Sequence, residues 1–385
     1  MRLGQLHLQR YRKAKDVVLP FGNIVVLIGP NGSGKSNLFD SLRFLASAAL
    51  TGDFAAAVSE RGGFVNMTWK GEEASRVVLT AMFSTASGEQ FEWNVCLEQS
   101  RQDFYVRESL QQIVLASPPS TILENNPHGD RWWWSATSGS RERLSLEPTA
   151  CALSAAAKNE AFPGRAIYEF IRTWVFADPN PGVLKYPSSP DRPAHLDFVG
   201  RNLAARLQVI KDSDPVAFER IRRIVGDITG VELTQLDVRE LDDGRVALSL
   251  GEQGLKYRVN QPAISNGILR ILALAVALSG TDRARLFAVE EPENYVHPTA
   301  LESLVQLLIT ASESSQILVT THSPLVLNCF GDMPEAVYVV NGPSGQGTTL
   351  EPGGAPDDIS RALAESGFSL GDFWMSRGFK VSNSD

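Results

Sequence analysis

The sequence predicts an α/β fold with a mainly parallel core sheet and helices, an antiparallel β meander and an α/β insertion. Apolar runs at residues 24–28, 286–291 and 316–320 predict the core strands, because they have the form of strands buried on both faces. Three β-rich runs between residues 76 and 107, separated by polar turns, predict the meander.

Length and composition set the outer limits of the fold. With 385 residues, the chain can form two or three domain-sized units, or one large α/β head with an insertion. Its composition, 43% hydrophobic and 21% charged, is that of a globular protein with ample core. The formal net charge of −8 argues against a uniformly cationic surface for nucleic acid, but it is compatible with one local basic patch.

The cysteines and the apolar runs predict a cytoplasmic protein. Cys96, Cys151 and Cys329 lie far apart and form no CxxC pair, which disfavours a disulfide framework or a zinc site. No apolar leader follows Met1. The longest apolar stretch, residues 268–278, is short and interrupted by Arg270, so we expect no membrane span.

The N-terminal segment predicts strands followed by a phosphate-binding loop. Strands are expected at residues 3–9 and 16–19, and Pro20 closes the second because it cannot donate to a ladder. After the strand at 24–28 comes a P-loop, and an apolar-periodic helix follows it. The residues predicted to bind nucleotide are Gly29, Pro30, Asn31, Gly32, Ser33, Gly34, Lys35, Ser36 and Asn37.

The P-loop residues predict ATP and Mg²⁺ as cofactors. The glycines let backbone N–H groups close around phosphates, and the helix N-terminus adds its dipole. Lys35 would reach the β- and γ-phosphates, and the Ser36 hydroxyl would ligate Mg²⁺.

Residues 108–200 are rich in loop signals such as Pro118-Pro119 and the Gly/Ser stretch at 138–140. Within them lies the run 132–134, three consecutive tryptophans next to Arg131. This run could be a stacking platform for bases or an interface anchor. The more ordinary interpretation is a strand that buries some of the indoles and exposes the rest.

Residues 201–226 predict one amphipathic helical stretch with a cationic face. We expect this basic face to contact a nucleic-acid backbone or an acidic partner, and a solvated helix face is the alternative. Its members are Arg201, Arg206, Lys211, Arg220, Arg222 and Arg223. Beyond it, strands at 233–239 and 246–250 predict a hairpin around Asp242-Asp243-Gly244.

Ser265, Asn266 and Gly267 open the apolar helix at 268–278. A Ser/Gly-led helix start is an anion site. In a head-to-tail dimer, this element could close on the γ-phosphate held by the other subunit.

Two strand ends predict the remaining site residues. Glu290 and Glu291 end the strand at 286–291, at the sheet edge where ligands bind. Glu290 would hold Mg²⁺, and Glu291 would orient or deprotonate the attacking water. The next buried strand leads into His322, which could hydrogen-bond a γ-phosphate oxygen or the water.

Together these motifs resemble the RecF/SMC branch of ABC-type ATPases, in particular bacterial predicted ATPases similar to the ATPase domain of OLD-family proteins. The matching motifs are GPNGSGKSN (29–37), ISNGILRILALAVAL (264–278), VEEPENYVHP (289–298) and VTTHSP (319–324). The resemblance implies an ABC-type P-loop head, a signature motif at Ser265–Gly267 that acts in trans, and a switch histidine at His322.

The sequence departs from the family pattern at three points. Glu290 stands where an aspartate is usual, and its side chain is one methylene longer. The signature is Ser-Asn-Gly rather than Ser-Gly-Gly. No Q-loop glutamine is assigned, since Gln111 and Gln112 only follow the meander.

The motifs suggest four segments along the chain. Residues 1–107 and 261–345 form the two parts of the ATPase head, and 108–260 form the insertion. Residues 346–385 form a tail that docks back through the apolar run 370–374. A loop is expected at 342–354, and a short helix at about 358–365.

The leading functional hypothesis is an ATP-dependent homodimer that acts as a switch on DNA or on an effector protein such as a nuclease or toxin. The alternative is the ATPase subunit of an OLD-like system whose nuclease is a separate chain, because the acids after His322 follow no strand that ends in a carboxylate pair. A transporter subunit ranks low, since Lys35 and Ser265 lie too far apart in the sequence. The resemblance implies genome maintenance or anti-phage defence.

Overall fold

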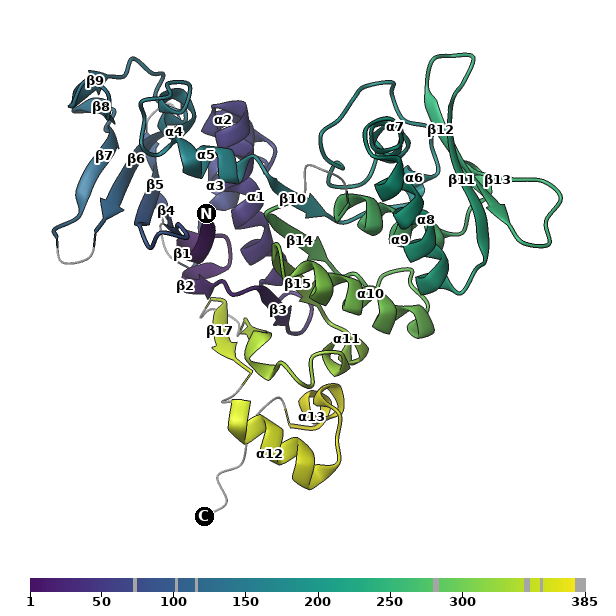
Figure 1. Cartoon of the computed structure of the whole chain (residues 1–385). Coiled ribbons are helices and arrows are strands. Elements are labelled where there is room, and N and C mark those ends of the chain that lie inside the picture. Colours follow the sequence, from purple (N-terminus) through teal and green to yellow (C-terminus); the bar gives the residue numbers. More distant parts are fainter. Residues whose placement is uncertain are drawn as a thin grey trace. The chain divides into compact units, whose positions relative to one another are not determined.

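The computed structural model describes residues 1–71, 75–100, 103–114, 117–279, 284–342, 347–353 and 356–377 (Figure 1). The chain divides into two compact units. The first unit comprises Met1–Val25, Gly29–Trp174 and Tyr338–Glu351. The second unit comprises Val26–Ile28, Val175–Val337 and Pro352–Asp385.

An eight-stranded antiparallel sheet dominates the first unit. Its strands are β1 (Arg2–Tyr11), β2 (Ala14–Pro20), β4 (Arg76–Ser84), β5 (Gln90–Ser100), β6 (Asp103–Ile113), β7 (Ser120–Asn125), β8 (Arg131–Ser135) and β9 (Ser140–Arg143). Their order in the sheet is β2-β1-β4-β5-β6-β7-β8-β9. Every second residue of β4 and β5 is buried, because alternate side chains point to opposite faces and one face carries the core.

The predicted N-terminal strands and the meander are confirmed, and the sheet extends further than the sequence predicts. β7, β8 and β9 fall in the segment in which loop signals dominate. The prolines at 118–119 directly precede β7, and Gly139, with φ 62°, lies in the turn between β8 and β9. The loop signals therefore mark the turns, while strands of four to six residues are too short to show a clear period.

The three tryptophans lie in β8. Trp132 and Trp133 are buried, whereas Trp134 is 37% exposed. The Arg141 guanidinium lies 4.0 Å from the centroid of the Trp132 ring. The interpretation as a partly buried strand is confirmed.

Helix α1 (Lys35–Thr51) forms the core of the first unit together with the sheet. It contacts β1 and β2 as well as three helices of the same unit. Its apolar stripe, which includes Leu38, Leu42 and Leu45, is fully buried. The other helices of this unit are α2 (Phe54–Ser59), α3 (Phe64–Met67), α4 (Ala152–Ala156) and α5 (Arg165–Ile171).

The tail contributes a strand that the sequence does not predict. β16 (Val337–Asn341) and β17 (Thr349–Pro352) are neighbouring strands. The prediction of a loop throughout 342–354 is therefore wrong at β17. Part of that segment, residues 343–346 and 354, lies outside the described residues.

The second unit contains the predicted core strands β14 (Leu286–Glu290) and β15 (Gln316–Thr321) and residues 26–28 of the predicted strand β3 (Ile24–Ile28). β10 (Trp174–Ala177) was not predicted from the sequence, and it begins the strand order β10-β14-β15-β3. β14 and β15 pair in parallel, with Glu290 opposite Thr320. Both strands are almost completely buried, which explains their continuous apolar character.

Helices and a small sheet complete the second unit. The helices are α6 (Pro181–Leu184), α7 (Leu203–Ser213), α8 (Pro215–Thr229), α9 (Asn266–Ala277), α10 (Pro298–Ala311), α11 (Pro324–Asn328), α12 (Pro356–Ser366) and α13 (Leu370–Arg377), with 3₁₀ turns η1 (Gln261–Ala263) and η2 (Pro334–Ala336). The predicted hairpin is confirmed: β11 (Leu233–Glu240) and β12 (Val246–Glu252) are antiparallel, and β13 (Val259–Asn260) adds a third strand. In α13, Leu370 and Phe373 are buried, and the Gly371 amide donates to Asn328 Oδ1 at 2.8 Å.

The predicted single helix at 201–226 is two helices. Asp214 breaks it, and its side chain accepts a hydrogen bond from the Ala217 amide at 2.9 Å. Pro215 then starts α8, because proline is favoured in the first helical turn and cannot continue α7.

The expected basic face is also corrected. Arg206 is only 4% exposed, and its guanidinium donates to the Pro193 carbonyl, so it is a core residue. Arg222 donates to Glu219 and to the Leu233 carbonyl. Lys211 forms an ion pair with Asp237 at 3.0 Å. Several of these cations are thus neutralised within the fold, and Arg201 and Arg220 remain among the exposed ones.

Within the part of the chain that the structure describes, the model contains no helix with both the length and the apolar character needed to cross a bilayer.

Candidate functional site

The P-loop of the first unit joins β3 to α1 and depends on glycine at two positions. Gly34 precedes the helix with φ 113°, and a Cβ there would lie 2.1 Å from Thr348 Oγ1. A Cβ at Gly29 would lie 2.2 Å from the Val340 carbonyl oxygen. No other residue type fits these positions without displacing the neighbouring backbone or side chain.

The loop is held from inside and from outside. Lys35 is buried, and its Nζ donates to the carbonyl oxygens of Gly29 at 2.7 Å and Pro30 at 3.1 Å. From outside, Thr348 Oγ1 donates to the Ser33 carbonyl at 2.9 Å, and Lys13 Nζ donates to the Gly32 carbonyl at 2.6 Å. The loop is therefore preorganised in its curled form.

The loop also presents polar groups that phosphates can use. Asn31 and Ser36 are exposed, and Asn37 is half-buried. Ser33 Oγ is buried and has no hydrogen-bond partner among the described residues. The first amides of α1 point out of the helix start, where an anion is favoured by the helix dipole.

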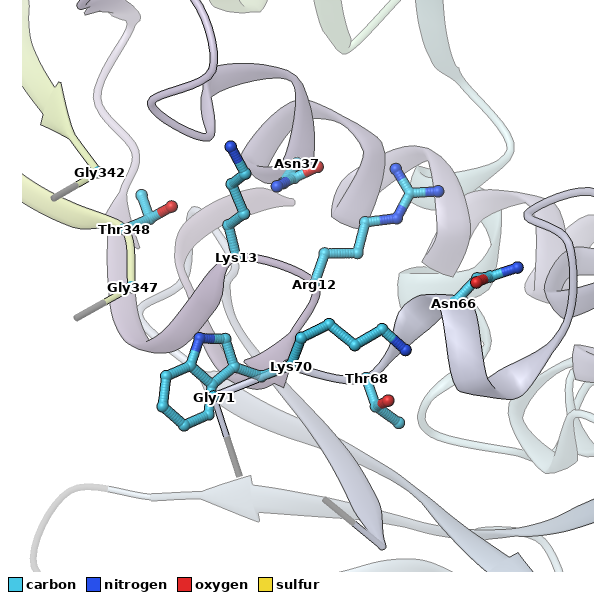
Figure 2. A pocket seen from close by; sticks show the side chains of 11 residues that line it. Arg12, Lys13, Asn37, Asn66, Thr68, Lys70, Gly71, Gly342, Gly347 and Thr348 are labelled. Atoms are coloured by element: carbon cyan, nitrogen blue, oxygen red, sulfur yellow. The ribbon is translucent and has the colours of Figure 1, made fainter. Parts of the chain in front are cut away.

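A pocket of about 540 Å³ lies beside the loop (Figure 2). This volume suits a nucleoside-sized ligand. Arg12, Lys13 and Lys70 line it, and none of its described lining residues carries a carboxylate. The remaining lining residues are Asn37, Asn66, Thr68, Trp69, Gly71, Gly342, Gly347 and Thr348.

Buried ion pairs fix Arg12 at this pocket. Asp40, on α1, accepts hydrogen bonds from the Tyr11 hydroxyl at 2.7 Å and from Arg61 at 2.9 and 3.0 Å. Arg12 Nη1 lies 3.1 Å from the same carboxylate. Burial, and then the Asp40 charge, raise the pKa of Tyr11 well above its usual value, so its hydroxyl stays a donor to Asp40.

Apart from Asn37, the residues that line the pocket were not predicted from the sequence. Arg12 and Lys13 form the turn between the first two predicted strands. This basic pair at a turn is the sequence feature that could have indicated the pocket. Thr348 gave no signal, because it lies far along the chain in a predicted loop.

In the second unit, the ends of β14 and β15 bring Glu291 and His322 together. The Glu291 amide donates to the Thr320 carbonyl at 2.8 Å, which continues the pairing of the two strands by one residue. His322 Nδ1 lies 3.3 Å from Glu291 Oε1. Glu291 has φ 43°, an uncommon left-handed conformation for a residue other than glycine.

Two further side chains complete this carboxylate–histidine cluster. Asn294 Nδ2 donates to Glu291 Oε2 at 2.8 Å. Glu293 Oε1 accepts from Thr321 Oγ1 at 2.6 Å and from the His322 amide at 3.1 Å, and it lies 3.5 Å from His322 Nδ1. Glu293 and Asn294 were part of the quoted motif, but the sequence assigned them no role.

Ser265 caps α9 in the second unit, as the sequence predicts for a helix start. Its side chain accepts from the Ile268 amide at 3.3 Å. Ser265 and Asn266 are exposed, and Gly267 is half-buried. A Cβ at Gly267 would lie 2.9 Å from the Tyr295 carbonyl oxygen, so the helix start lies close to the loop that follows Glu291.

The other candidate residues have distinct positions. Glu290 is half-buried at the end of β14. Gln111 and Gln112 lie in β6, where Gln112 donates to Glu89. Among the described residues, no group of three or more His, Cys, Asp or Glu side chains is arranged to hold a metal ion by itself.

A family model with the description "AAA domain, putative AbiEii toxin, Type IV TA system" matches residues 24–328. The chain belongs to this AAA-domain family. The match extends from β3 past His322 and so contains every candidate site residue identified from the sequence.

One relative of known identity is an SMC protein. The chromosome partition protein Smc of Thauera aminoaromatica is 31% identical over 134 residues, which are 33% of this chain and 10% of that relative. The chain thus matches about a tenth of that protein's length.

The structural neighbours show the fold. An Smc head crystallised with the C-terminal winged-helix domain of ScpA is 14% identical, with a TM-score of 0.55 and coverage of 91% of this chain and 97% of that chain. The SMC head domain from Thermotoga maritima is 16% identical, with a TM-score of 0.48 and coverage of 91% and 99%. The first of these supports the predicted fold, an SMC head of the ABC-type P-loop ATPase class, and the predicted resemblance to the RecF/SMC branch is confirmed.

Proposed function

We propose that this AAA-domain protein binds and hydrolyses ATP, dimerises head to tail on ATP, and thereby acts as a switch on DNA or on an effector protein. The observation that supports ATP binding best is the preorganised P-loop with its cationic pocket. A curled loop at a helix N-terminus, with three cations lining the adjacent pocket, favours a polyphosphate over a neutral ligand.

The proposed roles in the first unit follow from this geometry. Residues Gly29–Asn37 hold the phosphates, with Lys35 as the cation for the β- and γ-groups. Arg12 and Lys13 line the pocket and are positioned to bind the rest of the nucleotide. Both already have fixed positions, because Asp40 and the Gly32 carbonyl hold them.

Mg²⁺ would neutralise charge on the β- and γ-phosphates. Ser36 offers it a hydroxyl and Glu290 a carboxylate. One or two protein ligands suffice, because Mg²⁺ keeps phosphate oxygens and waters as its other ligands. The exposed Ser36 hydroxyl at the start of α1 fits this role.

Glu291 is the proposed general base. It would accept a proton as a water oxygen attacks the γ-phosphorus, while the bond from that phosphorus to the ADP oxygen breaks. Asn294 orients one carboxylate oxygen, and His322 lies beside the other. Glu293 in turn fixes the backbone of His322.

The proposed dimer rests on the start of α9. Ser265, Asn266 and Gly267 form an accessible helix N-terminus, which is favourable for an anion. We infer that it binds the γ-phosphate held by a second copy of the chain, so that ATP joins two heads.

The family and the Smc relative suggest two settings for this switch. The family description names a toxin of a type IV toxin–antitoxin system, and the curated relative is a chromosome partition protein. We infer a role in anti-phage defence or genome maintenance. The partner would be DNA or an effector such as a nuclease or toxin.

A second candidate is the regulatory ATPase of an OLD-like nuclease carried on a separate chain. Among the described residues after His322, β16 ends at Asn341 and β17 ends at Pro352, so neither strand ends in a carboxylate pair. The acids Asp357, Asp358 and Asp372 lie in α12 and α13. This favours a nuclease outside the described chain.

The variant Glu291→Gln tests the proposal. The amide cannot accept the proton of the water, so turnover should fall about 100-fold or more while ATP still binds. With ATP and Mg²⁺, equilibrium sedimentation at micromolar concentration should show a stable dimer, and without ATP a monomer. A variant that stays monomeric with bound ATP would refute the dimer, and turnover within a few-fold of the unaltered protein would place the base elsewhere.

A further inference from the structure

Helix α9 carries a single charged side chain, and that side chain is buried. Arg270 is 1% exposed in a helix that is otherwise apolar beyond its first turn. A buried guanidinium is strongly destabilising unless hydrogen bonds satisfy it. The hydrogen-bond partners of Arg270 therefore indicate its role in the fold.

Arg270 binds the backbone of both candidate catalytic carboxylates. Its Nη2 donates to the carbonyl oxygens of Glu290 at 2.9 Å and Glu291 at 2.8 Å. Its Nη1 donates to the Pro179 carbonyl at 2.5 Å and lies 3.2 Å from Asp178 Oδ1. One guanidinium thus ties α9 to the end of β14 and to the segment after β10.

These bonds determine how the Glu291 peptide is oriented. Glu291 adopts φ 43°, which costs about 1 kcal/mol or more for a residue other than glycine and persists only where neighbours hold it. Arg270 supplies two such bonds, one on each side of the Glu291 α-carbon. The side-chain direction of Glu291 follows from that peptide orientation.

The same helix touches the same loop at a second point. Gly267 packs so closely on the Tyr295 carbonyl that a Cβ would lie 2.9 Å away, and Tyr295 itself has φ 65°. Gly267 and Arg270 are three residues apart, so they share one face of α9. A displacement of the helix start would therefore be transmitted to the loop that carries Glu291.

We infer that Arg270 is a positioning residue that couples the signature motif to the general base. This rests on the proposed function, in which Ser265–Gly267 receives the γ-phosphate of a second subunit. Arg270 already holds the Glu291 backbone in the single chain, and a phosphate that docks at the start of α9 would act on Glu291 through this arginine.

The test is Arg270→Lys, with ATP affinity, ATP-dependent association and turnover measured on the full chain. Lysine keeps the charge but cannot bridge the Glu290 and Glu291 carbonyls and the Asp178–Pro179 segment together. We expect turnover at saturating ATP to fall about 10- to 100-fold. ATP affinity should stay within about threefold, since the P-loop is untouched, and the ATP-bound dimer should still form.

Two further variants keep the test interpretable. Asp178→Asn serves if Arg270→Lys does not fold, because it alters a half-exposed partner and removes only one anchor of the guanidinium. It should lower turnover about three- to tenfold, while ATP affinity and ATP-dependent association stay unchanged. Arg192→Lys, at an arginine 77% exposed in a surface ion pair, is the matched control and should change nothing.

The outcomes separate this inference from the proposed function. If the unaltered protein neither associates with ATP nor hydrolyses it, the proposed function fails and the coupling fails with it. If the unaltered protein does both, turnover within twofold in Arg270→Lys and Asp178→Asn refutes the coupling alone. Loss of the dimer in a variant that keeps its melting temperature also refutes it, because Arg270 would then serve association rather than the base.

Discussion

Backbone geometry requires a particular residue type at individual positions of the P-loop. Gly34 has φ 113° against Thr348, and Gly29 meets the Val340 carbonyl, so both positions require the absence of a Cβ. Lys35 has a different constraint, since its ammonium must lie inside the loop, where it now donates to two carbonyls. Together these three residues hold one positive charge inside the loop, against the carbonyl oxygens of Gly29 and Pro30.

Lys35→Ala should reduce ATP turnover about 100-fold or more and weaken ATP binding, because the β- and γ-phosphates lose their counter-ion. Steady-state hydrolysis and fluorescent-nucleotide titration measure the two effects. Lys158→Ala, at an exposed lysine of the same unit, is the control. Unchanged turnover in Lys35→Ala would remove the P-loop from the reaction.

Between elements of the first unit, a buried carboxylate joins a strand to a helix. Glu108 of β6 is 1% exposed and accepts hydrogen bonds from the Ala152 amide at 2.6 Å and the Leu153 amide at 2.7 Å, at the start of α4. The Trp93 indole of β5 donates to it at 2.9 Å. Burial nevertheless outweighs these donors and raises the pKa of Glu108 to about 7.

This carboxylate predicts a specific pH dependence. Because the pKa of Glu108 is about 7 when folded and near its ordinary value of 4.5 when unfolded, the folded state binds the extra proton between these values. Its contribution to stability is complete below about pH 4.5 and is lost as the pH rises through about 7, by roughly 3 kcal/mol in total.

Glu108→Gln should remove this slope. At every pH the amide presents an NH₂ group to at least one buried N–H donor, which costs about 1–3 kcal/mol. In urea unfolding between pH 5 and 8, the stability advantage of the unaltered protein over the variant should shrink as the pH rises. An advantage that stays constant or grows with pH would mean that the three N–H donors, rather than burial, decide the protonation of Glu108.

For the chain as a whole, the proposed function needs two copies. The P-loop lies in the first unit, whereas the carboxylate–histidine cluster and the start of α9 lie in the second. In the proposed dimer, Ser265 serves the nucleotide of the partner subunit, so binding by one chain and association of two chains can be separated by mutation.

Ser265→Arg should block ATP-dependent association while ATP binding by the monomer stays within about threefold, because the bulk enters where the opposing γ-phosphate docks. Sedimentation with ATP and Mg²⁺, in the Glu291→Gln background, measures association, and nucleotide titration at low protein concentration measures binding. An equal loss of both would show that Ser265 does not act in trans.

Local sequence patterns explain which site residues could be predicted from the sequence. The P-loop, Glu290–Glu291 and His322 each follow a buried strand, and chain direction alone places such residues at strand ends. The helix at 201–226 shows the limit of this reasoning: its period indicated a cationic face, yet Arg206 turned out to be buried and Arg222 bound to Glu219. Periodicity predicts which side chains share a face, but not what packs on it.

The sequence by itself determined three of the core strands (24–28, 286–291 and 316–320), the P-loop and the order of the motifs, because period, glycine requirement and turn chemistry act between near neighbours in the chain. Only the tertiary structure decided that Thr348 holds Ser33, 315 positions away, that Arg12 and Lys13 line a pocket, and that Arg270 binds the Glu290 and Glu291 backbone. Such contacts join segments that are remote along the chain. Their energies depend on burial and approach, which exist only once the chain has folded.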